Sequence, residues 1–88
     1  MHMEFSIPGS RSLKEKRRAM NSLKSLLRSR FNASIAEVGL KDKWARSRLA
    51  VCVVSDDSAH VHSQLSEIAR FSSNHHAAEL TDFYIETM

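Results

Sequence analysis

The sequence predicts an α+β fold, in which two helices pack on one face of a four-stranded antiparallel sheet. Two stretches repeat apolar residues with the helical period of 3.6, over about residues 13–30 and from the cap candidates at 55–58 to about residue 73. Between and around them, four shorter segments have the apolar pattern of strands: 1–7, 33–39, 44–55 and 80–87. The order β-α-β-β-α-β, in two halves of similar length, is that of a ferredoxin-like sandwich.

Length and composition indicate a single domain over residues 1–88. Of the 88 residues, 42% are apolar and 26% are charged, which is typical of a folded domain. The longest apolar run, from Leu49 to Val54, is far shorter than the ~20 residues of a membrane-spanning helix. The first residues lack the basic-then-apolar pattern of a secretory leader, so we expect no signal peptide. Because Cys52 is the only cysteine, we expect no disulfide and no CxxC site. A cytoplasmic protein without membrane association is the simplest expectation.

The first strand and helix have clear boundaries. Residues 1–7 alternate apolar and polar side chains, which predicts a half-buried strand that ends at Pro8. Ser12 and Glu15 have the spacing of a capping box, in which the hydroxyl accepts from an amide near Glu15 and the carboxylate accepts from the Ser12 amide. The helix that follows buries an arc made of Leu13, Met20, Leu23, Leu27 and Phe31. Lys16 lies inside this arc, so we expect it to snorkel past the first turn to water.

The middle of the chain predicts an outer strand and a central strand. Residues 33–39 alternate except between Ile35 and Ala36, which suggests a bulge. The strand that begins at Trp44 has apolar residues on both faces, as a central strand does. One apolar set must therefore face away from the helices, and a partner subunit would cover it. We expect this homodimer face to be Leu49, Val51 and Val53, or else Ala50, Cys52 and Val54.

The last helix and strand complete the pattern. Residues 55–58 offer several N-cap side chains and place carboxylates where the helix dipole favours them. Asn74 is a plausible stop. Residues 80–87 read as an edge strand, because the charged residues Glu79, Asp82 and Glu86 suit an edge.

Charge is distributed unevenly along the chain. Residues 1–48 hold 12 of the 13 Lys and Arg residues against four acids, a net charge of +8, whereas residues 49–88 hold one arginine against six acids, a net charge of −5. Five cations of the first helix occupy an arc of about 120° beside its apolar arc: Lys14, Arg17, Arg18, Lys24 and Arg28. Other residues extend this candidate nucleic-acid surface: Arg11, Lys41, Lys43, Trp44, Arg46 and Arg48. The alternative is a solvated helix face with Trp44 in the core.

Several segments together resemble the YlxP-like family of small bacterial proteins, a family of unknown function with a ferredoxin-like fold. The run from Ser12 to Arg18, Ser-Leu-Lys-Glu-Lys-Arg-Arg, is the most specific of them. The others are Ile7-Pro8-Gly9, Arg30-Phe31-Asn32, Ala36-Glu37-Val38, Trp44, Val53-Val54-Ser55 and Ala59-His60-Val61. The resemblance implies an RNA or ribosome context, because members tend to be encoded beside transcription, translation-initiation and ribosome-maturation genes. It supplies no catalytic residues.

These observations favour a non-enzymatic module that binds RNA or a ribosomal subunit. The third strand lacks base-stacking aromatics, and only Gly9 and Gly39 are glycines, so contacts should be electrostatic and not base-specific. A homodimeric structural or regulatory protein–protein module is the alternative. His60 and His62 lie about 200° apart around a helix and cannot share an ion, so we expect no metal. We also expect no cofactor, no catalysis and no small-molecule substrate.

Overall fold

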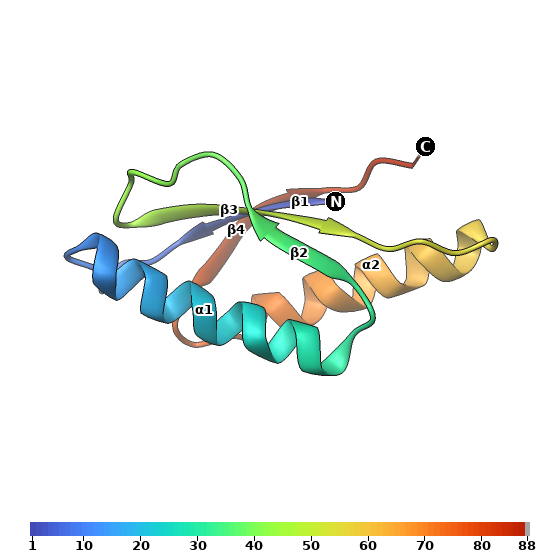
Figure 1. Ribbon diagram of the computed structural model, residues 1–88, viewed down its shortest axis with the longest axis horizontal. Coiled ribbons are helices and arrows are strands. Elements are labelled where there is room, and N and C mark those ends of the chain that lie inside the picture. Colours follow the sequence, from blue (N-terminus) through green and yellow to red (C-terminus); the bar gives the residue numbers. More distant parts are fainter. Residues whose placement is uncertain (88) are drawn as a thin grey trace.

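The computed structural model describes residues 1–87 and has six secondary-structure elements (Figure 1). Met88, at the end of the predicted domain, lies outside the described residues. The elements follow the order β-α-β-β-α-β: β1 (His2–Ser6), α1 (Leu13–Arg30), β2 (Ser34–Glu37), β3 (Arg46–Cys52), α2 (Ser58–Ser73) and β4 (Glu79–Tyr84).

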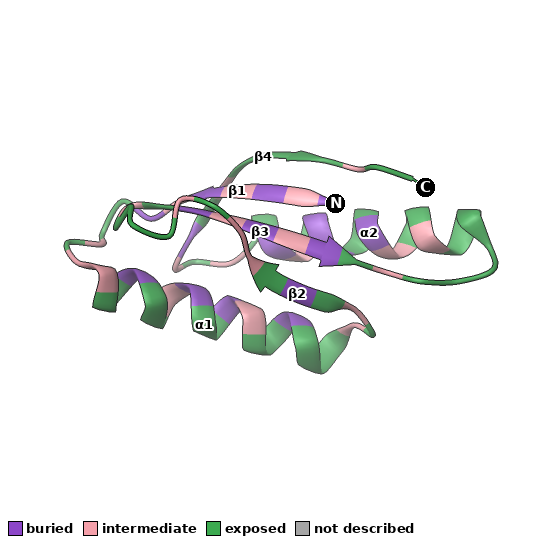
Figure 2. Cartoon of the chain, turned by 45° about the horizontal axis from the view of Figure 1, so that its top comes forward, coloured by how far each residue is buried: buried purple, intermediate pink, exposed green. Residues whose placement is uncertain are grey.

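One antiparallel sheet carries both helices on the same face. Its strand order is β2-β3-β1-β4, so β1 and β3 are central and β2 and β4 form the edges. Figure 1 shows α1 and α2 side by side on one side of this sheet, and Figure 2 shows the buried residues of α1 along the side that faces it. The predicted α+β ferredoxin-like sandwich is confirmed.

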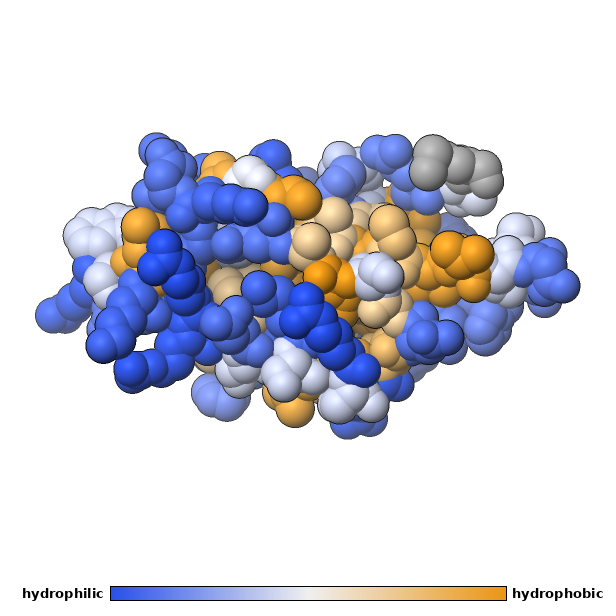
Figure 3. All heavy atoms as spheres, viewed as in Figure 1, coloured by the Kyte–Doolittle hydropathy of each residue, from blue (hydrophilic) through white to orange (hydrophobic). Residues whose placement is uncertain are grey.

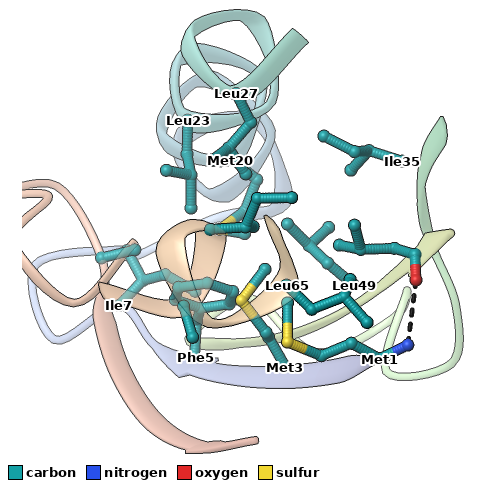
Figure 4. Close-up of a cluster of buried hydrophobic side chains, with 14 residues drawn as sticks. Met1, Met3, Phe5, Ile7, Met20, Leu23, Leu27, Ile35, Leu49 and Leu65 are labelled. Carbon is teal, nitrogen blue, oxygen red and sulfur yellow. Dashed lines mark hydrogen bonds between the residues drawn. The ribbon is translucent and has the colours of Figure 1, made fainter. Parts of the chain in front are cut away.

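The core fills the space between the sheet and the helices. Figure 4 shows the odd-numbered residues of the first strand region, Met1 to Ile7, close to side chains of both helices and of β3. Because side chains alternate along a strand, the even-numbered residues of β1 lie on the open face. The helices contribute Met20, Leu23, Leu27, Leu65, Ile68 and Ala69 to the core.

The predicted homodimer face is placed differently. Leu49 and Val51 are fully buried within the chain, and Val53 packs against the same core. The open face instead carries the other set, of which Ala50 and Cys52 lie in β3. Since Arg46, Arg48 and Ala50 share that face, it bears no continuous apolar stripe. The expectation that Leu49, Val51 and Val53 face outward is therefore wrong.

The strands also differ in detail from the sequence prediction. β2 pairs with β3 in unbroken register from Ser34 to Glu37, so the predicted bulge is absent there. The alternation slips because Glu37 shares the helix-facing side with Ile35, where it meets a buried lysine. The irregularity lies elsewhere, between Glu4 and Phe5 of β1 where they pair with β4. Trp44 precedes β3 and Val54 follows it, so both lie outside the strand.

Candidate nucleic-acid interface

Helix α1 separates its cations from its apolar residues as its periodicity predicts. Lys14, Arg17 and Arg18 are exposed near its start, whereas the buried part of α1 lies along the side that faces the sheet (Figure 2). Arg11, just before the helix, is exposed as well. These positions leave the charged groups in water, where a phosphate can reach them.

Most of the basic residues have no carboxylate partner. Within residues 1–87, the ion pairs are Lys16–Glu37, Arg46–Glu4, Arg48–Glu4 and Arg70–Glu67, so four of the 13 Lys and Arg residues are paired. The other nine are Arg11, Lys14, Arg17, Arg18, Lys24, Arg28, Arg30, Lys41 and Lys43. Uncompensated positive charge of this density attracts anionic polymers.

The cations in the second half of α1 are less free than those at its start, because two of them make contacts within the fold. Lys24 is half-buried. The Arg28 guanidinium donates to the backbone carbonyl of Ile35 at 2.7 Å, which covers part of the β2 edge. Arg30 lies over the ring of Phe71, 4.7 Å from its centroid, and so ties α1 to α2. The free cations are therefore densest at the start of α1.

Lys16 does not reach solvent as predicted. Lys16 is only 1% exposed. Its Nζ donates to the Leu40 carbonyl at 2.6 Å and lies 3.3 Å from Glu37 Oε2. Ser47 donates to the same carboxylate oxygen at 2.6 Å. A buried ammonium is tolerated only when paired and hydrogen-bonded, and this network supplies both requirements. Lys16 thus fastens α1 to β2 and to the loop that follows β2.

The loop between β2 and β3 lies at the same end of the molecule as the start of α1 (Figure 1). Gly39 and Leu40 both have positive φ, of 66° and 52°, where the chain turns. Lys41, Lys43 and Trp44 are exposed beyond this turn, and Trp44 is 56% exposed. The alternative expectation of Trp44 in the core is wrong.

We call this part of the surface the basic end and define it by Arg11, Lys14, Arg17, Arg18, Lys41, Lys43 and Trp44. Figure 3 shows hydrophilic residues gathered there. The acids within the same two segments are Glu15 and Asp42, so cations outnumber acids six to two.

Arg46 and Arg48 do not belong to this surface. Both lie on the open face of the sheet, where Glu4 pairs with Arg46 at 3.5 Å and accepts from the Arg48 Nε at 3.0 Å. The hydrogen bond from Arg48, helped by the charges of both arginines, holds the pKa of Glu4 below its usual value, although partial burial opposes the shift. Asp82 lies directly across from Glu4 on this face, so the face is close to neutral.

One of the amides at the start of α1 is occupied by the helix cap. Ser12 Oγ accepts from the Glu15 amide at 3.1 Å, as the capping box predicts. The Glu15 carboxylate, however, accepts from the amide of Arg11 and not from that of Ser12. The cap therefore uses the Glu15 amide, which an anion would otherwise bind.

A groove of about 490 Å³ lies at the opposite end of the molecule, between the end of β3 and α2. Its apolar lining includes Val53, Val54, Val61 and Leu65, and no Lys or Arg lines it. Val54 is 95% exposed. Figure 3 shows apolar residues gathered toward this end. The basic and apolar parts of the surface are therefore well separated.

Residues 1–87 contain neither a cluster of metal ligands nor a helix suited to a membrane. No three His, Cys, Asp or Glu residues in this range lie together in a way that could hold a metal ion. In the same range, neither helix has the length and apolar character that crossing a membrane requires.

The fold and the basic end together define a small ferredoxin-like α+β domain with one strongly cationic end. Residues 1–85 match the family described as protein of unknown function (DUF503), and the chain belongs to this family. Over 60 residues it is 32% identical to the uncharacterized protein YlxP of Bacillus subtilis (strain 168), a match that covers 68% of this chain and 65% of the relative. The chain thus spans slightly less than two thirds of that relative's length. The predicted membership of a YlxP-like family is confirmed.

Sequence reasoning found the exposed cations of α1 but missed the role of Lys16. Its position inside the apolar arc was the available signal. A lysine there needs a buried acceptor, and Glu37 occupies a helix-facing position of the next strand.

Proposed function

We propose that this protein is a non-enzymatic binding module for RNA or the ribosome, and that the basic end is its contact surface. One observation carries the proposal: all six cations of the basic end are exposed, and none has a carboxylate partner within residues 1–87. Phosphates are the natural partners of such a surface, and arginine can bind them through two parallel hydrogen bonds. A module for ribosomal RNA would act in the cytoplasm.

The proposed contact is electrostatic. The open face, which binds RNA in many proteins of this fold, carries Glu4 and Asp82 beside Arg46 and Arg48 and has no excess positive charge. Lys24 and Arg28 extend the basic end along α1. Because these side chains meet phosphates and not base edges, affinity should depend steeply on salt and little on sequence.

A protein–protein interaction module is the second candidate. The apolar groove favours it, because Val54 is almost fully exposed and the lining contains no cation. Homodimerisation stays a prediction, and it must use a surface other than the buried Leu49 and Val51. In this alternative the cations would contact an acidic protein. The unaltered protein would then not bind RNA, and alanine substitutions in α1 would weaken its binding to that protein.

The decisive variant replaces three cations of α1. Arg17→Ala, Arg18→Ala and Lys24→Ala together should weaken binding to ribosomal RNA at least about tenfold and lower the log–log salt slope by about two to three units. None of the three side chains has an ion pair among residues 1–87, so the fold should survive. Fluorescence anisotropy across a salt series measures the affinity and the slope.

Arg70→Ala is the matched control. Arg70 is an exposed cation of α2, already paired with Glu67, and lies outside the basic end. Its substitution should leave both the affinity and the salt slope unchanged. Equal binding by the triple variant and the parent protein would refute the proposal.

A further inference from the structure

We propose that the ligand of the basic end is an unpaired, single-stranded segment of nucleic acid, and that Trp44 stacks on one of its bases. This inference rests on the proposed function and names the class of nucleic acid. It draws on three features: the exposure of Trp44, the cations around it and the contacts that hold its loop.

Trp44 is a large aromatic side chain that the fold leaves in water. It is 56% exposed and lies in the loop before β3, outside the hydrophobic core. Lys41 and Lys43 are exposed in the same loop. Exposed aromatic rings among cations are the usual platform for unpaired bases, because the ring takes the base while the cations follow the backbone.

Tyr84 provides an internal comparison. It is also a large exposed aromatic side chain, but it lies on the open face in register with His2, and its ring contacts that histidine at 5.0 Å between centroids. Its neighbours on the adjacent positions of this face include Glu4 and Asp82, whose charges repel phosphates. Of the two rings, only Trp44 lies in a loop that also carries two exposed lysines without an ion pair among residues 1–87.

The Trp44 loop is fastened on both sides. At its start, Leu40 accepts from the Lys16 Nζ at 2.6 Å and from the Lys43 amide at 3.0 Å. At its end, Ala45 accepts from the Ile7 amide at 2.8 Å. The bond from Lys16 joins the loop to α1, and the bond from Ile7 joins it to the segment that follows β1, so the loop is tied to the fold on both sides of Trp44. A platform that is ordered before binding loses less entropy when a ligand arrives.

A duplex cannot use this platform fully. Its bases are stacked on one another, so a protein side chain meets mainly phosphates and groove edges. A single strand can place a base on Trp44 while its phosphates reach the cations of the loop and of α1. Stacking accepts any base, so this contact adds little sequence preference.

The test compares a single-stranded and a fully duplex RNA of equal length. Trp44→Ala should weaken single-strand binding about fivefold to a hundredfold, which corresponds to the loss of one stacked base, and should change duplex binding little. Trp44→Phe should retain most of the affinity. Tyr84→Ala is the matched control and should bind both RNAs as the parent protein does. Because Trp44 is the only tryptophan, its fluorescence in the parent protein should be quenched by the single strand and not by the duplex.

Three outcomes are distinct. Selective loss in Trp44→Ala, with quenching in the parent protein, supports the inference. RNA binding that is equal in Trp44→Ala and the parent protein, without quenching, overturns the inference but leaves the proposed function standing. Absence of binding to either RNA at low salt overturns the proposed function, and the inference falls with it.

Discussion

The two β-α-β halves of the molecule share one topology but present different surfaces. In the half formed by β1, α1 and β2, the strand and helix bury a continuous apolar face, and so do β3 and α2 in the second half. Outside the core the halves diverge. Within residues 1–87, all nine unpaired cations precede β3, whereas the cations of β3 and α2, which are Arg46, Arg48 and Arg70, are each paired with a glutamate.

This contrast shows which features the fold requires and which it does not. A ferredoxin-like sandwich requires inward faces that pack, and both halves meet that requirement with similar residues. It requires nothing of the outer face of either helix. The unpaired charge at the start of α1 therefore adds nothing to packing, and repulsion between like charges opposes the compact state. A ligand that neutralises it is the physical explanation we favour.

Substitutions in the core should lower the free energy of unfolding by a similar amount in either half. Leu23→Ala in α1 and Ile68→Ala in α2 each remove a fully buried side chain, so each should lower the free energy of unfolding by about 2–5 kcal/mol. Leu26→Ala, at an exposed position of α1, should change it far less. Urea denaturation followed by circular dichroism measures these differences. A much smaller loss in one half would mean that the two halves do not share one core.

Lys16 offers a sharper test, because it links the core of the first half to the basic end. Lys16→Met should lower the free energy of unfolding by about 1–3 kcal/mol, since Glu37 would lose its partner while retaining some access to water. It should also free the loop, so that acrylamide quenches Trp44 more strongly. Adding Glu37→Gln should recover part of the stability. Unchanged quenching in Lys16→Met would show that Lys16 does not hold the loop.

The smallest expected effect is on the pH dependence of stability. It concerns His75, which lies where the chain leaves α2 and contacts α1. Burial lowers the pKa of His75 below its usual value, the charge of His76 lowers it further, and the Ala19 carbonyl opposes the shift. A group whose pKa is depressed in the folded state contributes stability above its unfolded pKa and loses it as the pH falls. The unfolding temperature should therefore decline as the pH falls from about 8 to about 5.

His75→Gln should reduce this decline, and thermal unfolding at several pH values measures it. Substitution of His62, an exposed histidine near the other end of α2, should by contrast leave the decline in place. A decline of equal size in His75→Gln would exclude His75 as its cause.

Periodicity predicted the fold well, because both helices and the central strands are long and regular. The bounds of α1 agree with the expected residues 13–30, and Ser12 caps the helix as predicted. It was harder to predict which side chains of β3 face the helices, since both faces of this strand are apolar in the sequence. Only its register with β1, where Met3 lies opposite Leu49, places Leu49 and Val51 in the core.

The candidate site was predictable where it depends on helix geometry and not where it depends on distant contacts. The angles around α1 placed Lys14, Arg17 and Arg18 on its exposed side. The pairing of Arg46 and Arg48 with Glu4, which lies more than 40 residues away in the chain, depends on strand register. The loop that carries Trp44 is held by Lys16 across 24 residues, and no local pattern encodes such a contact.

The most direct test of the central claim is the salt dependence of binding between the unaltered protein and ribosomal RNA. Anisotropy titrations from about 50 to about 200 mM salt would give the log–log slope, and ribosomal subunits can be assayed in parallel by sedimentation. Contact between the cations of the basic end and five or six phosphates predicts saturable binding with a slope of about four to five. No saturable binding at the lowest salt, or a slope near zero, would contradict the account.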